Sequence, residues 1–298
     1  MAEQTAHVNG IEIVHETIGD PSDPPLLLVM GLGMHLIHWD LELCERFAER
    51  GFHVIRFDNR DSGRSTKIDA PVPDLRRALA GLRLDAPYLL EDMAGDAFGL
   101  LDHLGIESAH LVGASMGGMI AQTMAIQRPE RVRSLTSIMS TTGERRAGRP
   151  KLRVMGVLMR RAPEEKQAYI ERFVRIFRLI GSKGFPLDDE RIRELAAQTY
   201  ERGHNTAGTG RQLAAIMASG DRTEQLRRLD VPTTVFHGRD DPLVPLRGGR
   251  ATAKAIPGAR LIAIPGMGHD LPHQVWPQLV DAVVETAERA APATAYTA

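Results

Sequence analysis

Short apolar runs recur along this chain, and turn-forming or charged residues separate them. The run 26–30 is apolar throughout, which is typical of a strand buried on both faces of a parallel sheet. Further runs that predict strands occupy residues 53–57, 109–113, 135–139, 233–236 and 261–264. Residues 7–17 alternate apolar and polar positions around Asn9-Gly10, a pair that predicts a tight hairpin.

Between these runs, apolar positions repeat with helical spacing at residues 39–50, 92–104, 118–128 and 275–289. Strands that alternate with helices predict the α/β class, with a mostly parallel central sheet and helices on both faces. Residues 142–226 break this alternation, because they show helical periodicity and no convincing strand. We therefore expect a core of residues 1–141 and 227–298. A helical cap, 142–226, is expected over the sheet edge at which open α/β folds bind ligands.

Composition narrows the class of protein. The chain has 298 residues, of which 43% are hydrophobic, so it is long enough to bury a large core. A formal net charge of -1 provides no overall attraction to nucleic acid or to an anionic membrane. The single cysteine, Cys44, excludes an internal disulfide framework. No apolar run reaches the roughly 18 residues of a membrane span, and the first residues lack a signal-peptide pattern, so we expect a cytoplasmic protein.

The segment Gly113-Ala114-Ser115-Met116-Gly117 lies between a predicted strand and a predicted helix. A serine at such a turn, with a glycine two residues to either side, is typical of a nucleophile elbow. The turn is so tight that side chains at the two glycine positions would clash, and it strains the backbone of the serine. We therefore predict that Ser115 presents its hydroxyl above the sheet edge.

Two possible partners of this serine follow later strands. A serine hydroxyl is a weak nucleophile at neutral pH, so it needs a base, and the base needs an acid to orient it. Asp241 lies in the loop after the run 233–236, and His269 lies in the loop after 261–264. Each loop is expected at the same sheet edge as Ser115. The chain order serine, aspartate, histidine matches that of hydrolase triads on such a sheet.

These motifs resemble those of the α/β-hydrolase superfamily over nearly the full length of the chain. More narrowly, they resemble the serine-esterase branch that includes aclacinomycin methylesterase. The segments that carry the resemblance are 26–31, 53–65, 115–117 and 264–269. It implies that Ser115, Asp241 and His269 are nucleophile, acid and base. The family pattern G-x-x-D-x-x-x-P places its proline on Pro245, which favours Asp241 over the adjacent Asp240.

The tetrahedral intermediate of such a reaction carries an oxyanion, which backbone N–H groups must face. By position, Met116 supplies one N–H group, and Leu32 in the loop after the first central strand supplies the other. Many family members have a histidine where Met30 stands. Because the oxyanion donors are backbone groups, methionine at that position leaves them in place. The predicted helix that begins near Met116 adds a favourable dipole at the same point.

The remaining histidines and charged runs are weaker candidates. His110 and His237 are expected to be core residues, whereas His35 and His38 follow the oxyanion loop and are candidates for lining the pocket. No histidine has metal-ligand spacing with cysteines or carboxylates, so neither a metal nor a cofactor is expected. The charged run 58–64 predicts a salt-bridged loop. The basic run 145–161 predicts a solvated helix face or an attraction for an acidic substrate.

Together these residues predict hydrolysis of a small-molecule carboxylic ester through an acyl-enzyme on Ser115. Lactonases, perhydrolases and carbon–carbon bond hydrolases with the same triad also resemble this core. The last group often has tryptophan after its histidine, where this chain has Asp270. Haloalkane dehalogenases and epoxide hydrolases use aspartate at the elbow, so Ser115 disfavours them. Outside enzymes, the alternative is a ligand-binding protein that retains the triad. The sequence carries no signal for an oligomeric state.

Overall fold

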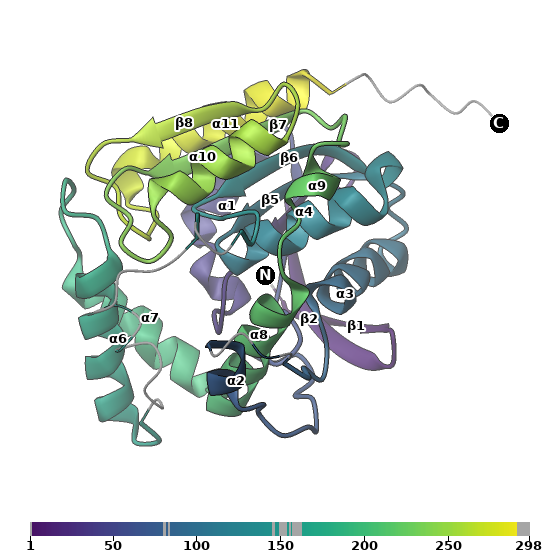
Figure 1. Cartoon of the computed structure of the whole chain (residues 1–298). Helices are drawn as coiled ribbons and strands as arrows, with labels where there is room; N and C mark the ends of the chain where they lie inside the picture. Colours follow the sequence, from purple (N-terminus) through teal and green to yellow (C-terminus); the bar gives the residue numbers. More distant parts are fainter. Residues whose placement is uncertain are drawn as a thin grey trace.

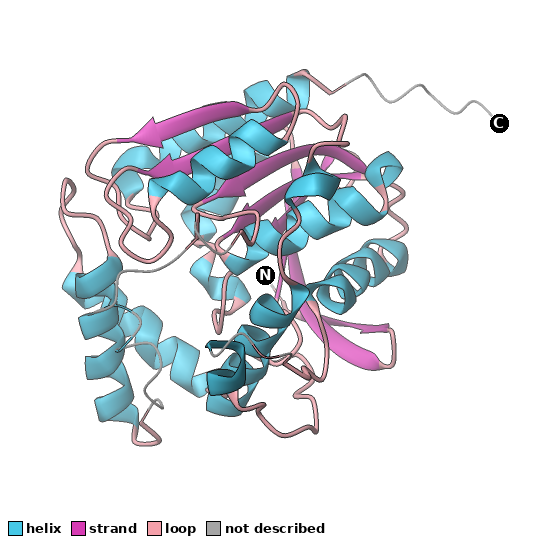
Figure 2. Cartoon of the chain, in the orientation of Figure 1, coloured by secondary structure: helices cyan, strands magenta, loops and turns pink. Residues whose placement is uncertain are grey.

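The computed structural model describes residues 2–79, 82, 84–144, 147–148, 154, 156 and 163–290. These residues form an eight-stranded sheet, drawn in magenta in Figure 2. The strands are β1 (Gln4–Val8), β2 (Ile11–Ile18), β3 (Pro25–Val29), β4 (His53–Phe57), β5 (Ala109–Ala114), β6 (Val132–Ile138), β7 (Thr233–Gly238) and β8 (Arg260–Ile264). Their order across the sheet is β1-β2-β4-β3-β5-β6-β7-β8, and all neighbours from β4 to β8 pair in parallel.

Helices connect the strands (Figure 1). The α-helices of the described residues are α1 (Leu41–Ala48), α2 (Leu75–Leu79), α3 (Leu90–His103), α4 (Met116–Gln127), α6 (Lys166–Ile180), α7 (Asp189–Glu201), α8 (Thr206–Ser219), α9 (Thr223–Leu226), α10 (Leu246–Ala255) and α11 (Trp276–Glu288). Short 3-10 turns are η1 (Leu36–His38), η2 (Pro129–Arg131) and η3 (His273–Val275). None of the described helices is long and apolar enough to cross a membrane.

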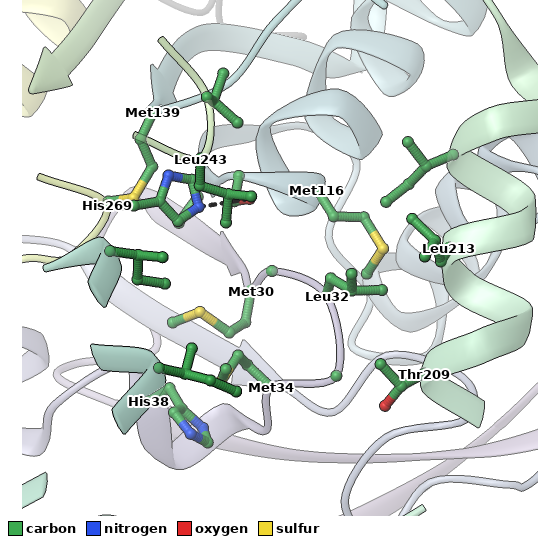
Figure 3. Close-up of a pocket in the computed structure, with 18 of the residues that line it drawn as sticks. Met30, Leu32, Met34, His38, Met116, Met139, Thr209, Leu213, Leu243 and His269 are labelled. Carbon is green, nitrogen blue, oxygen red and sulfur yellow. Dashed lines mark hydrogen bonds between the residues drawn. The ribbon is translucent and has the colours of Figure 1, made fainter. Parts of the chain in front are cut away.

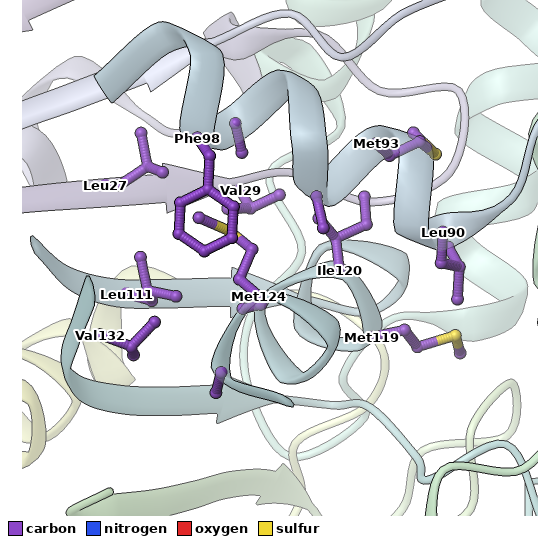
Figure 4. Packing of buried hydrophobic residues seen from close by; sticks show 14 of the residues in the cluster. Leu27, Val29, Leu90, Met93, Phe98, Leu111, Met119, Ile120, Met124 and Val132 are labelled. Atoms are coloured by element: carbon purple, nitrogen blue, oxygen red, sulfur yellow. The ribbon is translucent and has the colours of Figure 1, made fainter. Parts of the chain in front are cut away.

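The sheet is buried on both faces, because alternate residues of a strand point to opposite sides. In β3, Leu27 and Val29 pack with α3 and α4 in the cluster of Figure 4. Leu26 and Leu28 pack on the other face, with α1 and α11. The continuous apolar run of β3 therefore fills two cores at once. The predicted mostly parallel sheet with helices on both faces is confirmed.

The strand order decides where the polar loops meet. β5 lies at the centre of the sheet, between β3 and β6, and β7 and β8 follow on one side. In a parallel sheet the carboxyl ends of the strands share one edge, where open α/β folds bind ligands. The loops after β3, β5, β7 and β8 hold Leu32, Ser115, Asp241 and His269, respectively.

Between β6 and β7 the described residues form α6, α7, α8 and α9 and add no strand, in agreement with the sequence pattern. α6 and α7 pack against each other and stand apart from the sheet at the lower left of Figure 1. Ile170 and Phe173 of α6 and Ala196 of α7 form a small buried apolar cluster between them. α8 lies instead against α3 and α2. The basic side chains of the run 145–161 lie outside the described residues.

Two described helices were not predicted from the sequence. α2 lies in the connection between β4 and α3, and α10 forms the crossover between β7 and β8. Parallel neighbours need such a crossover, but Gly248 and Gly249 conceal the helical pattern of α10. The structure explains Gly249, because a Cβ atom there would lie 2.5 Å from Nδ1 of His237.

Candidate active site

Ser115 stands at the junction of β5 and α4, in a backbone conformation with φ 57° and ψ −117°. Positive φ is uncommon outside glycine, and such strain persists only where the surroundings impose it. The surroundings here are two close backbone contacts. A Cβ atom at Gly117 would lie 1.9 Å from the carbonyl oxygen of Val29, and one at Gly113 would lie 2.3 Å from that of Gly117. Only glycine fits at either position, which explains the spacing of the motif.

A continuous chain of hydrogen bonds joins three of the predicted residues. His269 Nε2 lies 3.0 Å from Ser115 Oγ (Figure 3), and His269 Nδ1 lies 2.6 Å from Asp241 Oδ2. A carboxylate only accepts hydrogen bonds, so Nδ1 carries the proton and Nε2 is free to accept from the serine hydroxyl. Ser115 and His269 are half-buried, whereas Asp241 is 3% exposed. His269 lies 154 positions after Ser115, so the structure brings together residues that are far apart in the sequence.

Asp241 is held by the backbone of its own loop. Its Oδ1 accepts hydrogen bonds from the N–H groups of Leu243 and Val244, each at 2.8 Å. This leaves Oδ2 directed at His269. The neighbouring Asp240 points elsewhere and accepts a hydrogen bond from the N–H group of Gly266. Of the two adjacent aspartates, Asp241 is the one in contact with the histidine.

The loop that carries His269 is held by the last residue of α6 and by residues that follow this helix. The N–H group of His269 donates to the carbonyl oxygen of Ile180 at 2.8 Å. The N–H group of Gly268 donates to Ser182 Oγ at 2.9 Å, and that hydroxyl donates to Asp270 Oδ1 at 2.5 Å. Burial raises the pKa of Asp270. Asp270 therefore helps, through Ser182, to hold the loop that carries His269.

Leu32 and Met116 are each one residue away from a residue at the nucleophile turn: Leu32 follows Gly31, which lies against Ser115, and Met116 follows Ser115 itself. Leu32 lies in the turn after β3, next to Gly31, at which a Cβ atom would lie 3.8 Å from Ser115 Oγ. Met116 is the first residue of α4 and is fully buried. Among the hydrogen bonds of the described residues, none uses the backbone N–H group of Leu32 or of Met116. Both residues line the cavity above the serine (Figure 3).

That cavity has a volume of about 2750 Å³ and is bounded by the sheet edge and by α6, α7 and α8. Its wall is largely apolar. Near Ser115 the wall contains the flexible side chains of Met30, Met34, Met116, Met119 and Met139. The connection before α3 contributes Val72, Leu75, Leu84 and Leu89, a contribution for which the sequence carried no recognisable signal. The site is therefore suited to a ligand with substantial apolar surface.

His35 and His38 line the cavity, as the sequence left open. Their loop places His38 Nδ1 3.0 Å from the N–H group of His35, and His38 Nε2 lies 3.3 Å from Thr199 Oγ1 of α7. Burial lowers the pKa of His38 to about 4, and burial together with nearby His38 lowers the pKa of His35 to about 2. Both imidazoles are therefore neutral near pH 7, and they add no charge to the cavity wall.

His110 and His237 form no hydrogen bond with Ser115 among those of the described residues, although His237 Nε2 lies 3.8 Å from Asp241 Oδ2. His110 in β5 is 3% exposed, and its Nδ1 lies 2.8 Å from Ser134 Oγ of β6. His237 is fully buried, and its Nε2–H donates to the carbonyl oxygen of Val244. Burial lowers the pKa of both imidazoles. These histidines are core residues in the structure.

The charged run 58–64 forms ion pairs whose partners all lie outside the run. Asp61 receives both Nε and Nη2 of Arg211 in α8, at 2.9 and 2.6 Å. Asp58 accepts from Nη2 of Arg202, just after α7, at 2.6 Å. The run therefore connects the sheet edge to the helices between β6 and β7. Among the described residues, no group of three or more histidine, cysteine, aspartate or glutamate side chains is arranged to hold a metal ion.

Comparison with known proteins places the chain in a family. It belongs to the alpha/beta hydrolase fold family, whose model matches residues 24–274. Rhodomycin D methylesterase DauP of Streptomyces sp. (strain C5) is 32% identical over 290 residues, which cover 90% of this chain and 92% of that protein. Rhodomycin D methylesterase DnrP of Streptomyces peucetius is 32% identical over 289 residues, with 90% and 92% covered.

The fold is also shared with solved structures. The crystal structure of the esterase RhEst1 from Rhodococcus sp. ECU1013 has a TM-score of 0.75 to this chain at 20% identity. The match covers 98% of this chain and 100% of that one. At 20% identity this structural similarity shows the common fold alone.

Proposed function

We propose that this carboxylic ester hydrolase works through an acyl-enzyme on Ser115. The observation that carries the proposal is the hydrogen-bonded chain from Ser115 Oγ through His269 to Asp241 at the wall of the cavity. The elbow backbone fixes the serine, and the loop backbone fixes the aspartate. The similarity to two methylesterases supports carboxylic esters of small molecules as the substrate class.

Acylation uses the histidine first as a base and then as an acid. Ser115 Oγ attacks the ester carbonyl carbon while His269 Nε2 takes the hydroxyl proton, and the carbonyl electron pair moves onto oxygen. Asp241 stabilises the resulting imidazolium through its hydrogen bond to Nδ1–H. When the carbonyl re-forms, the bond to the alcohol oxygen breaks, and that oxygen receives the proton from His269. The alcohol leaves, and the acyl group stays on Ser115.

Deacylation repeats the sequence with water. His269 Nε2 takes a proton from a water molecule as its oxygen attacks the acyl carbon. The second tetrahedral intermediate collapses and breaks the bond to Ser115 Oγ, which recovers its proton from His269. The products are a carboxylic acid and the free enzyme, so no oxidant, reductant or cofactor enters the balance.

We assign the oxyanion hole to the backbone N–H groups of Leu32 and Met116. Their positions next to Gly31 and next to Ser115, and the lack of other acceptors for these N–H groups among the described residues, support this assignment. The N-terminus of α4 places its dipole at the same point. Removal of one such donor typically lowers kcat by about 10²- to 10³-fold.

We also propose that residues 142–226 form a cap over a core of residues 1–141 and 227–298. Side chains from α6, α7 and α8 form one wall of the cavity, and the core supplies Ser115 and His269 from the opposite side. The two connections between the parts run side by side, because the N–H group of Arg222 donates to the carbonyl oxygen of Thr142 at 2.9 Å. In this arrangement the cap selects the substrate and the core performs the chemistry.

Substitution of two serines tests the proposal. Ser115→Ala is expected to lower kcat for p-nitrophenyl butyrate by about 10⁴-fold or more, because the nucleophile is absent. Ser134→Ala is the matched control, since Ser134 is also hydrogen-bonded to a histidine but lies in the core. This control should retain wild-type kcat. Wild-type kcat in folded Ser115→Ala would contradict the proposal, whereas equal losses in both variants would point to damage of the fold.

A further inference from the structure

The turn that carries Leu32 is held from both ends. The N–H group of Met34 donates to the carbonyl oxygen of Gly31 at 3.2 Å, and Gly33 has φ +67°, which together describe a turn that requires glycine at its third position. Before the turn, Asn59 Nδ2 donates to the carbonyl oxygen of Met30 at 3.0 Å. The position of the Leu32 N–H group therefore depends on what holds the other end of the turn.

Gln212 of α8 holds that other end. Its Oε1 accepts a hydrogen bond from the N–H group of Gly33 at 2.8 Å. Its Nε2 donates to the carbonyl oxygen of Arg60 at 2.8 Å and to Ser62 Oγ at 2.9 Å. One side-chain amide therefore joins the turn after β3 to the loop after β4, although Gln212 lies 179 positions after Gly33 in the sequence.

The partners of Gln212 permit only one orientation of its amide. The Gly33 N–H group can only donate, and the Arg60 carbonyl can only accept, so an exchange of Oε1 and Nε2 would break both bonds. Gln212 is fully buried. One helical turn earlier, Thr209 packs against the same glycine, since a Cβ atom at Gly33 would lie 2.8 Å from Thr209 Oγ1.

Gln212 stands behind the cavity wall. Its neighbours on α8, Thr209 and Leu213, line the cavity and face the Leu32 turn in Figure 3. The described lining residues do not include Gln212. Its amide is therefore placed to act on the turn and not on the substrate.

We propose that Gln212 is a positioning residue for the oxyanion hole: by binding the Gly33 N–H group, it holds the Leu32 N–H group toward the carbonyl oxygen that becomes the oxyanion. This inference rests on the proposed function. In this proposal α8 has two roles. It forms part of the cavity wall, and through Gln212 it orients one of the two N–H groups that stabilise the oxyanion. A donor displaced by a fraction of an ångström still contacts the ground-state ester but stabilises the transition state less.

Gln212→Met and Gln212→Asn test this role. Methionine preserves length and volume but forms none of the three hydrogen bonds, and asparagine is one methylene too short to reach both Gly33 and Arg60. Each variant is expected to lower kcat for p-nitrophenyl butyrate by about tenfold, part of the 10²- to 10³-fold effect of losing a donor, with KM unchanged. The affinity for butylboronic acid, whose tetrahedral adduct on Ser115 places an oxygen in the oxyanion hole, should fall by the same factor.

Ser219→Ala is the matched control on the same helix. Ser219 Oγ accepts a hydrogen bond from the N–H group of Leu90 at 2.9 Å, so its removal also loosens α8 from the core. It lies two helical turns from Gln212 and does not touch the turn after β3. This variant is expected to keep kcat and boronate affinity even if its melting temperature falls.

The possible results separate the two proposals. Wild-type kcat and boronate affinity in either folded Gln212 variant would overturn the positioning role, as would a change confined to KM. Equal losses of kcat in Ser219→Ala and in the Gln212 variants would also overturn it, because they would report loosening of α8 alone. If Gln212→Met does not fold, Gln212→Asn decides by the same criteria. A wild-type protein that neither hydrolyses the ester nor binds the boronate would instead refute the proposed function.

Discussion

Ser115 occupies a strained backbone conformation because its neighbours leave no alternative. The peptide at Gly117 passes so close to Val29 that there is no room for a side chain. The strain has a use, since it directs Oγ away from the sheet and toward His269. The same close contacts that require glycine at positions 113 and 117 also impose the conformation of Ser115. For this reason the sequence motif was enough to predict the local geometry.

Two glycine substitutions test this relation between sequence and geometry. Gly117→Ala is expected to lower the free energy of unfolding by about 2 kcal/mol or more, because the added methyl group collides with backbone atoms that cannot give way. Gly95→Ala in α3 is the control. Its added methyl group meets only Asn9 Nδ2, at 3.7 Å, and alanine favours the helix by about 0.5–1 kcal/mol. Denaturant unfolding measures both; equal stability of the two variants would contradict the steric explanation.

At the scale of elements, the strands followed their hydrophobic pattern closely. The run 53–57 became β4 without change of bounds, and 261–264 became β8 with one added residue. β4 is buried throughout, whereas β8 lies at the edge of the sheet and is buried only at Ile264. α2 is short, and the buried residues of α10 are small (Gly248, Gly249, Thr252 and Ala255), so neither helix shows a row of large apolar residues in the sequence.

The contacts between helices and loops could not be predicted from the sequence. Arg211 and Gln212 look like ordinary polar residues of a helix, yet the structure buries both against the loops after β3 and β4. The Arg211–Asp61 pair joins residues 150 positions apart. Taking such charges out of water costs energy that only a close, bidentate geometry offsets, so these pairs fix where α8 lies. The residues around Arg211 and Gln212 in the sequence do not indicate which distant loop α8 will contact.

At the scale of the whole molecule, buried histidines make stability depend on pH. Burial, with a smaller contribution from Arg133, lowers the pKa of His110 to about 4 from 6.5. Between these values the unfolded chain binds more protons than the folded one, so the free energy of unfolding falls as pH drops through this window. Burial likewise lowers the pKa of His38 to about 4, and it acts in the same direction.

His110→Gln tests this dependence on pH. Each buried histidine steepens the pH dependence of the free energy of unfolding by up to about 1.4 kcal/mol per pH unit. Denaturant unfolding at a series of pH values from neutral to acid should therefore show a shallower decline for the variant than for wild type. Glutamine can still hydrogen-bond to Ser134, which limits other effects. Parallel declines in the two proteins would contradict this role of His110.

At the scale of the whole molecule, the sequence predicted where the candidate catalytic residues meet but not the shape of the cavity above them. The convergence of Ser115, Asp241 and His269 follows from loops at the carboxyl edge of a parallel sheet, which the pattern predicted, whereas the order of the strands is known only from the structure. The cavity follows from how α6, α7, α8 and the connection before α3 fold over the sheet edge. Its shape depends on many weak contacts between distant segments, and for that reason the substrate class was predicted only as a small-molecule ester.

The central claim is that Ser115 is the nucleophile of an ester hydrolase, and covalent labelling tests it most directly. The protein is treated with one equivalent of a fluorophosphonate, residual turnover of p-nitrophenyl butyrate is followed, and the labelled peptide is identified by mass spectrometry. We predict that turnover falls in proportion to the label and that the label is on Ser115. Full turnover by the labelled protein, or a label on a different residue, would contradict the claim.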